Sequence, residues 1–167
     1  YLIRALPIIL KEQHDVCVVI AGEDFGYQSQ LEMEARKLGV DRKVLFTGRL
    51  SQKGIKKLYV DAEIIVVPSI YGEGFPRVIL EAMAAGKPVI ASKRKWASEV
   101  IEDGINGFLV EPKNPKALAE AIIKILQDKN LAKRIGKTNK NKVRNYSWDT
   151  VVDKLETIYW EVVSCKR

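Results

Sequence analysis

The sequence has few of the residues that bind metals or crosslink small domains. Its 167 residues include one histidine, His14, and two cysteines, Cys17 and Cys165, with no metal-ligand spacing between them. No Asp-x-Asp cluster occurs either, so nothing in the sequence predicts a metal site. Two isolated thiols are typical of a reducing compartment. We therefore expect a cytoplasmic protein in which Cys17 is a small core residue.

Long apolar runs are absent as well. No run approaches the about 20 residues that span a bilayer, although 47% of the residues are hydrophobic and 29% are charged, a composition typical of globular domains. No G-x-G-x-x-G follows a predicted strand, which disfavours a dinucleotide-dependent dehydrogenase. The chain does not begin with methionine, and its first residues are typical of a helix interior. We expect residues 1–167 to form a single domain that is a fragment of a longer protein.

Positive charge is present in excess. With 28 Lys and Arg against 21 Asp and Glu, the net charge is +7, and the cations are concentrated at residues 93–95 and 124–142. Such an excess favours polyanions or an anionic lipid surface, which is consistent with a peripheral position at the inner face of a membrane. The alternative for residues 124–142 is that lysines simply solvate exposed helix faces. We expect no nucleic-acid partner.

Apolar runs alternate with segments of helical periodicity along the chain. Strands are predicted at residues 16–21, 44–46, 64–67, 89–91 and 107–110, and helices at 2–10, 29–38, 52–59, 77–85, from 115, at 131–143 and at 147–163. This order predicts an α/β fold with a doubly wound parallel sheet, Rossmann-like, with C-terminal helices over about residues 115–164. The first strand is expected to be buried on both faces. Ligands of such sheets bind beyond the carboxyl ends of the strands, where Gly22, Gly48, Glu73 and Lys93 are expected to surround one cleft.

The most informative stretch is residues 66–92, which read VVPSIYGEGFPRVILEAMAAGKPVIAS. A strand is followed by a glycine-containing loop, a helix that Gly86 ends, and a second strand. Gly72 and Gly74 allow the backbone to approach a ligand closely, and the start of the helix offers free N–H groups and the positive end of its dipole to an anion. Glu73 and Glu81 flank this place. An anion site between two carboxylates suits a ligand that carries both phosphate and hydroxyl groups.

Glu73 and Glu81, separated by seven residues, resemble the E-x7-E signature of the retaining glycosyltransferases of group 1 (family 4-like), which have the GT-B fold. An isolated E-x7-E would carry little weight. Residues 99–110, EVIEDGINGFLV, are also similar to the family's E-V-I-x-D-G-x-x-G-x-L-V, and residues 44–69 resemble its F-x-G, L-Y, A-D and P-S segments in the same order. The resemblance covers nearly the whole chain. It implies the C-terminal, donor-binding half of the fold.

The resemblance also implies a substrate and roles for individual residues. The donor would be a nucleoside diphosphate sugar, such as a UDP-sugar or GDP-mannose, used in polysaccharide biosynthesis without a metal or other cofactor. Glu73 would accept hydrogen bonds from the sugar hydroxyls in the catalytic site, and Glu81 would bind the ribose hydroxyls. The remaining donor-binding residues would be Gly72, Gly74, Phe75, Pro76, Arg77 and Val78. Pro76 departs from the family's commoner glycine and removes one backbone donor.

In the parent enzyme, a hexosyl group would pass from the donor to a glycan or lipid-linked acceptor with retention at the anomeric carbon. The resemblance implies a missing N-terminal domain that binds this acceptor, so the isolated chain is expected to bind donor weakly and to transfer nothing. A central first strand of the donor domain is also expected to be missing. Its absence would leave its two neighbours to pair directly or leave an edge open.

Seven further candidates surround the expected cleft. They are Gly22, Gly48, Arg49, Lys53, Tyr71, Trp96 and Glu99. Arg49 and Lys53 offer positive charge to a phosphate, and Tyr71 would pack on the sugar or base or serve as a lid on the core. Trp96 follows Lys95 where the family usually has two glycines, so it would either stack on a sugar or block the pocket. Glu99 is expected to cap a helix start or to lie near one, and it is also a candidate for lining the cleft.

Other functions fit part of the pattern. A sugar-nucleotide epimerase or a glycan phosphorylase shares this fold. A non-catalytic anion-binding α/β module would use the basic face on lipid or nucleic acid; its binding would weaken steeply with salt and ignore Glu73. For Glu73 and Glu81 themselves, the alternative roles are an acidic residue favoured by the helix dipole and a helix-surface carboxylate.

Overall fold

The computed structural model describes residues 1–71 and 77–164. Its strands are β1 (Val18–Ala21), β2 (Val44–Gly48), β3 (Ile65–Val67), β4 (Val89–Ser92) and β5 (Phe108–Val110). Its longer helices are α1 (Leu2–Glu12), α2 (Gln28–Lys37), α3 (Gln52–Asp61), α4 (Arg77–Ala84), α6 (Pro115–Gln127), α7 (Lys129–Lys142) and α8 (Trp148–Ser164). Short helical turns are η1 (Asp41–Lys43), α5 (Lys95–Ser98) and η2 (Val143–Tyr146). The predicted alternation of strands and helices is confirmed.

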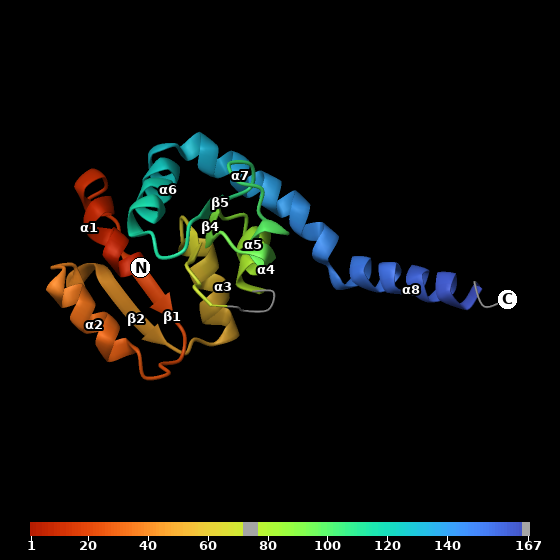
Figure 1. The fold of residues 1–167 in the computed structure, drawn as a ribbon, viewed down its shortest axis with the longest axis horizontal. Coiled ribbons are helices and arrows are strands. Elements are labelled where there is room, and N and C mark those ends of the chain that lie inside the picture. Colours follow the sequence, from red (N-terminus) through yellow and green to blue (C-terminus); the bar gives the residue numbers. More distant parts are fainter. Residues whose placement is uncertain (72–76, 165–167) are drawn as a thin grey trace.

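The strands form two parallel sheets (Figure 1). In the first, β1 pairs with β2, with Val18 opposite Val44. In the second, the order is β3-β4-β5, with Val66 opposite Ile90 and Ile90 opposite Phe108. Among the described residues no strand pair joins the two sheets, so of the two arrangements expected for the centre of the fold, the open edge is the one observed.

Helix α1 connects the two sheets through side-chain packing. Ala5 and Ile9 belong to the core between the β3-β4-β5 sheet and α6, whereas Ile3 and Leu6 pack with Val18 of β1 and with residues of α2. Each of these four α1 residues is at most 3% exposed. The far face of the second sheet is covered by α4 and α5, so that β4 is buried on both sides.

The first sheet is covered on one face only, and this corrects two predictions. Val18 faces the core, but Cys17 and Leu45, which point to the other side, are exposed. The predictions of a first strand buried on both faces and of Cys17 as a core residue are therefore wrong. The physical reason is that α1 and α2 pack on the same face, and no described element covers the opposite one.

Helix α8 extends away from the rest of the molecule (Figure 1). None of its 17 residues is buried, although it carries large apolar side chains such as Trp148 and Trp160. No helix in the described part of the chain has the length and apolar character that crossing a membrane requires.

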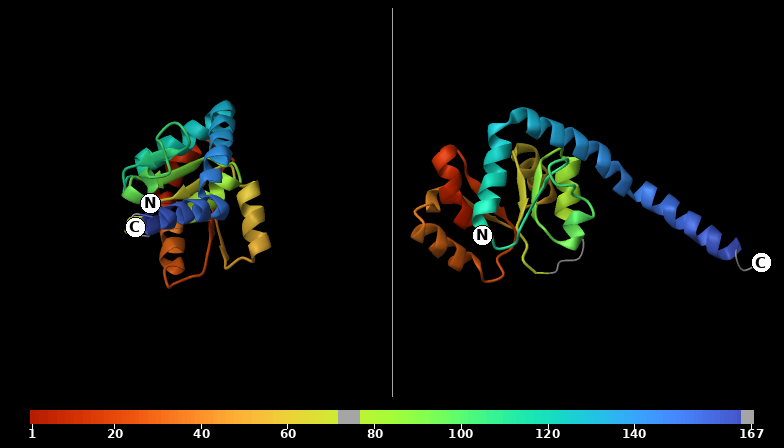
Figure 2. Two further views of the ribbon diagram at one scale, coloured as in Figure 1. Left: turned by 90° about the vertical axis from the view of Figure 1, so that its right-hand side faces the viewer. Right: turned by 45° about the horizontal axis from the view of Figure 1, so that its top comes forward.

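The strands of both sheets point the same way, so that their carboxyl ends lie along one edge of the molecule. The chain that leaves β1 and the chain that leaves β3 both emerge on the lower side of the view in Figure 2, right. This is the edge at which the sequence predicts the ligand.

Candidate functional site

The β3–α4 unit occupies this edge, as predicted. β3 ends at Val67 and α4 begins at Arg77. Five of the predicted site residues, Gly72, Glu73, Gly74, Phe75 and Pro76, lie outside the described residues, so their roles stay predictions. Arg77 and Val78 form the first turn of α4 and are both exposed, with Val78 at 42%. The side chains of this first turn therefore face solvent.

Helix α4 presents opposite faces to the core and to the solvent. Ile79, Ala82 and Met83 are completely buried against β3 and β4, because apolar residues recur at three- and four-residue spacing. Glu81 falls between them and is exposed. Its carboxylate is not freely solvated on every side, since the Tyr59 Oη donates a hydrogen bond to Glu81 Oε2 at 2.8 Å.

Tyr59 lies in the last turn of α3, and its ring packs against the core beneath α4. Burial raises the pKa of Tyr59, and the hydrogen bond to Glu81 and its negative charge raise the pKa further. The hydroxyl of Tyr59 therefore keeps its proton and donates it to the hydrogen bond with Glu81. Sequence reasoning placed Tyr59 in the L-Y segment but gave it no role. The signal was the helical phase of α3, which turns Tyr59 toward the core while Lys56, Lys57 and Val60 face solvent.

The loops after β1 and β2 meet at the same edge. The Gly22 N–H donates to the Gly48 carbonyl at 3.1 Å, and both residues have positive φ, +150° and +63°. Of the four residues predicted to surround one cleft, Gly22 and Gly48 thus lie together, and their roles toward a ligand stay predictions. Arg49 Nη1 lies 2.9 Å from Glu23 Oε1, so the cation expected to bind phosphate is paired with a carboxylate. Lys53 is exposed in the first turn of α3 and has no ion pair within the described part of the chain.

A cavity of about 150 Å³ lies where β1 and β2 end. Its lining includes Gly22, Gly48, Asp24, Phe25 and Tyr27. Pockets that enclose a whole small-molecule ligand of drug-like size usually measure about 300–1,000 Å³. The cavity therefore has room for only part of a ligand of that size.

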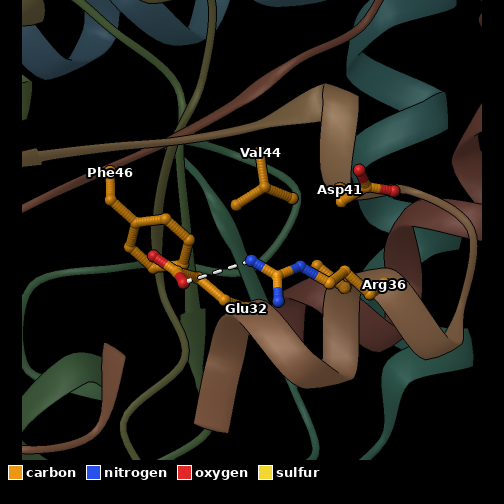
Figure 3. Close-up of a pocket in the computed structure, with 6 residues that line it drawn as sticks. Glu32, Arg36, Asp41, Val44 and Phe46 are labelled. Atoms are coloured by element: carbon orange, nitrogen blue, oxygen red, sulfur yellow. Dashed lines mark ion pairs between the residues drawn. The ribbon is translucent and has the colours of Figure 1, made fainter. Parts of the chain in front are cut away.

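A second cavity, of about 260 Å³, lies away from this edge, between α2 and β2 (Figure 3). Glu32 and Arg36, one turn apart on α2, form an ion pair of 3.7 Å on one side of it, and Val44, the first residue of β2, lies on its wall. Because it is near the amino end of the strand, it is not part of the candidate site.

The remaining candidates lie near the end of β4 or the end of β3. Tyr71 is 79% exposed, so it is no lid on the core. Trp96 is half-buried and packs against the cluster around α4 and β4. Glu99 is exposed and follows α5 as its C-cap, so the prediction that it lies near a helix start is wrong. The reason is that α5 has only four residues and ends where Val100 and Ile101 enter the core.

Arg94 is a second residue that sequence reasoning missed. Its Nη2 donates to the carbonyl of Ile70, three residues beyond the end of β3, and its Nε is buried with no hydrogen-bond partner among the described residues. The neighbouring Lys93 is paired with Glu111 at 3.6 Å. Two of the three cations at residues 93–95, Lys93 and Arg94, thus bind groups of the protein itself. No group of three or more potential metal ligands lies together in residues 1–71 and 77–164.

Comparisons with known proteins find glycosyltransferases as similar proteins. The family model described as "Glycosyl transferases group 1" matches residues 1–142. An uncharacterized glycosyltransferase of Methanocaldococcus jannaschii, MJ1607, is 41% identical over 160 residues, which are 95% of this chain and 40% of that protein. The phosphatidyl-myo-inositol mannosyltransferase of Mycobacterium leprae is 32% identical over 98% of this chain and 42% of its own length. The chain spans about two fifths of these relatives.

Solved structures agree with the sequence comparison. A glycosyltransferase from Rickettsia africae superimposes with a TM-score of 0.86 at 31% identity, over 97% of this chain and 43% of that one. The C-terminal domain of the group 1 protein LpcC from Francisella tularensis gives a TM-score of 0.77 at 32% identity, over 86% of this chain and 75% of the domain. Anabaena Alr3699/HepE in complex with UDP-glucose gives a TM-score of 0.82 at 30% identity, over 98% of this chain and 44% of that one.

Proposed function

Because the chain belongs to the group 1 glycosyl transferases and has the fold of their C-terminal domain, we propose that it binds a nucleoside diphosphate sugar at the edge where its strands end. In the full-length protein, a hexosyl group would then pass from this donor to an acceptor with retention. The observation that carries the proposal is the position of Glu81. It is exposed on α4, the helix that follows β3, and one of its carboxylate oxygens accepts a hydrogen bond from Tyr59.

Each part of the donor has a matching group in the proposal. Glu81 accepts hydrogen bonds from the ribose hydroxyls, and Glu73 accepts them from the sugar. The diphosphate lies at the start of α4, where backbone N–H groups and the helix dipole favour an anion. As the diphosphate departs, the same groups stabilise its growing negative charge, and Arg77 in the first turn adds a cation. No metal or other cofactor is required in this scheme.

The nature of the donor is proposed by analogy with relatives. The Anabaena structure holds UDP-glucose, which favours a UDP-sugar, and the Mycobacterium leprae relative is named as a mannosyltransferase, which keeps GDP-mannose as the alternative. The acceptor, glycan or lipid-linked, would bind to an N-terminal domain that these residues do not include.

An anionic membrane surface is a further proposed partner of the full-length protein. The exposed side of α7 carries five cations and no acid, namely Lys129, Lys133, Arg134, Lys137 and Lys140. This charge would favour a peripheral position in the cytoplasm, at the inner face of the membrane.

The proposal is tested by titrating UDP-glucose and GDP-mannose into the ¹⁵N-labelled chain and following amide shifts by NMR. Glu81→Gln removes the charge from the hydrogen bonds to the ribose. Hydrogen bonds to a charged group contribute about 1.5–3 kcal/mol and neutral ones about 0.5–1.5 kcal/mol, so affinity is expected to fall roughly five- to tenfold. The matched control is Glu120→Gln, an exposed carboxylate on α6, which should leave affinity unchanged. Equal affinity of Glu81→Gln and the unmodified chain would contradict the proposal, as would binding that depends on salt alone.

A further inference from the structure

We propose that Tyr59 is a positioning residue that orients the Glu81 carboxylate toward the ribose and so sets the preference of the site for ribonucleotides over deoxyribonucleotides. The inference rests on the proposed function, because it assumes that Glu81 binds the ribose. It adds a residue from a different helix, separated from Glu81 by 22 positions in the sequence.

Of the two hydrogen-bonded side chains, Tyr59 is held in place by packing and Glu81 is not. The Tyr59 ring is half-buried and packs against the core cluster that includes Ile79 and Ala82, so its hydroxyl has a fixed position. Glu81 is exposed on α4 and forms no ion pair among the described residues. Without the bond of 2.8 Å from Tyr59, its side chain would be free to sample several rotamers.

The division of the two carboxylate oxygens determines what Glu81 can recognise. A phenol donates one proton, and here it goes to Oε2. Oε1 therefore keeps its full capacity to accept hydrogen bonds from a ligand. The Tyr59 oxygen also retains lone pairs beside Oε2. A carboxylate held in one orientation can accept hydrogen bonds from two neighbouring hydroxyls at once. A ribose offers such a pair, at its 2′ and 3′ positions, whereas a 2′-deoxyribose has only the 3′-hydroxyl.

Pre-organisation predicts an effect on binding rather than on folding. In the unmodified protein Glu81 is already oriented when the ligand arrives, so less side-chain freedom is lost on binding. If Tyr59 loses its hydroxyl, the ring still fills its place in the core, but Glu81 must be ordered by the ligand. This loss of side-chain freedom on binding lowers the affinity mainly for ligands that bind Glu81 through both hydroxyls.

The test compares UDP with 2′-deoxy-UDP in four forms of the chain: unmodified, Tyr59→Phe, Glu81→Gln and the double variant. Tyr59→Phe is expected to weaken UDP about three- to tenfold and 2′-deoxy-UDP less than twofold, so that the ratio of the two affinities falls. In the Glu81→Gln background the Tyr59→Phe change should have a smaller effect, since the amide oxygen that replaces the carboxylate accepts a weaker hydrogen bond from the phenol. Tyr159→Phe on the exposed α8 is the matched control and should change neither affinity.

The outcomes distinguish this inference from the function on which it rests. If Glu81→Gln weakens UDP but Tyr59→Phe leaves the ratio unchanged, or weakens both ligands equally, the positioning role is overturned and the donor site stands. If Glu81→Gln binds UDP as the unmodified chain does, the proposed function itself fails. Should Tyr59→Phe lower the melting temperature strongly, the ratio is measured at a lower temperature, where the variant is folded; an unchanged ratio there also overturns the role.

Discussion

Two hydrogen-bonded side-chain pairs show how burial changes what such a pair does. Asn106 and Asn139 are at most 1% exposed and bond to each other at 3.1 Å. Asn139 also donates to the Lys87 carbonyl at 2.9 Å, so this pair fixes α7 to the turn before β4. Buried amides need such partners because an unsatisfied one costs about 1–3 kcal/mol. Tyr59 and Glu81, in contrast, leave one carboxylate oxygen open to solvent, which suits binding rather than packing.

The pKa of Tyr59 offers a prediction at the residue scale. Burial raises it first, followed by the hydrogen bond and charge of Glu81. Because the folded-state pKa lies above the ordinary value of 10.0, the contribution to stability is complete below that value and is lost as the pH rises through the folded-state pKa. In Glu81→Gln the pKa should fall but remain raised, since burial persists.

Phenolate absorbance during an alkaline titration measures this shift, and Tyr59→Phe identifies which transition belongs to Tyr59. An identical Tyr59 transition in Glu81→Gln and the unmodified chain would show that the two side chains do not interact in solution.

At the scale of helices and strands, the boundaries set by local chemistry were predictable. Ser51 and Asn114 cap α3 and α6 with their side chains, and Gly86 ends α4 with φ +71°, as the sequence indicates. The errors arose where burial depends on a distant segment. The apolar run before Ala21 predicts burial on both faces, but only one face of that strand is covered. Glu99 was predicted near a helix start, whereas it directly follows the four-residue α5, which is too short to show periodicity in the sequence.

Gly136 provides the prediction at this scale, because nothing local in α7 explains it. A Cβ at Gly136 would overlap the carbonyl oxygen of Gly86, so α7 can approach the end of α4 only with glycine there. Gly136→Ala should destabilise the fold by about 1–3 kcal/mol, despite the better helix propensity of alanine. Gly54→Ala in α3 is the matched control, since its Cβ would find no atom closer than 3.4 Å, and it should gain up to about 1 kcal/mol.

Urea denaturation of both variants gives the two free energies of unfolding directly. Equal stabilisation by the two alanines would mean that α7 and the α4–β4 turn are not in contact as described.

At the scale of the whole molecule, the two sheets are joined by packing of α1 rather than by a shared strand. The sequence predicted the α/β class, because strand order follows from local patterns, and it predicts a ligand at the edge where the strands end. The sequence did not decide whether the two sheets would pair directly or leave an open edge between them. The local pattern of a strand does not specify which other strand lies beside it, and in the structure β1-β2 and β3-β4-β5 remain separate. Likewise, the Tyr59–Glu81 contact joins two helices whose relative position no local pattern specifies.

The last prediction concerns α8, which has no buried residue. Because it contributes little apolar burial, a chain that ends at Ser147 should have nearly the same stability, with a melting temperature changed by less than about 2 °C. A chain that ends at Gln127 is the control: it also lacks α7, which buries Leu131 and Ile135, and should melt far lower or fail to fold. Thermal unfolding followed by circular dichroism measures both. A large fall on removing α8 alone would show that its apolar side chains pack on this part of the molecule in solution, in place of extending from it as Figure 1 shows.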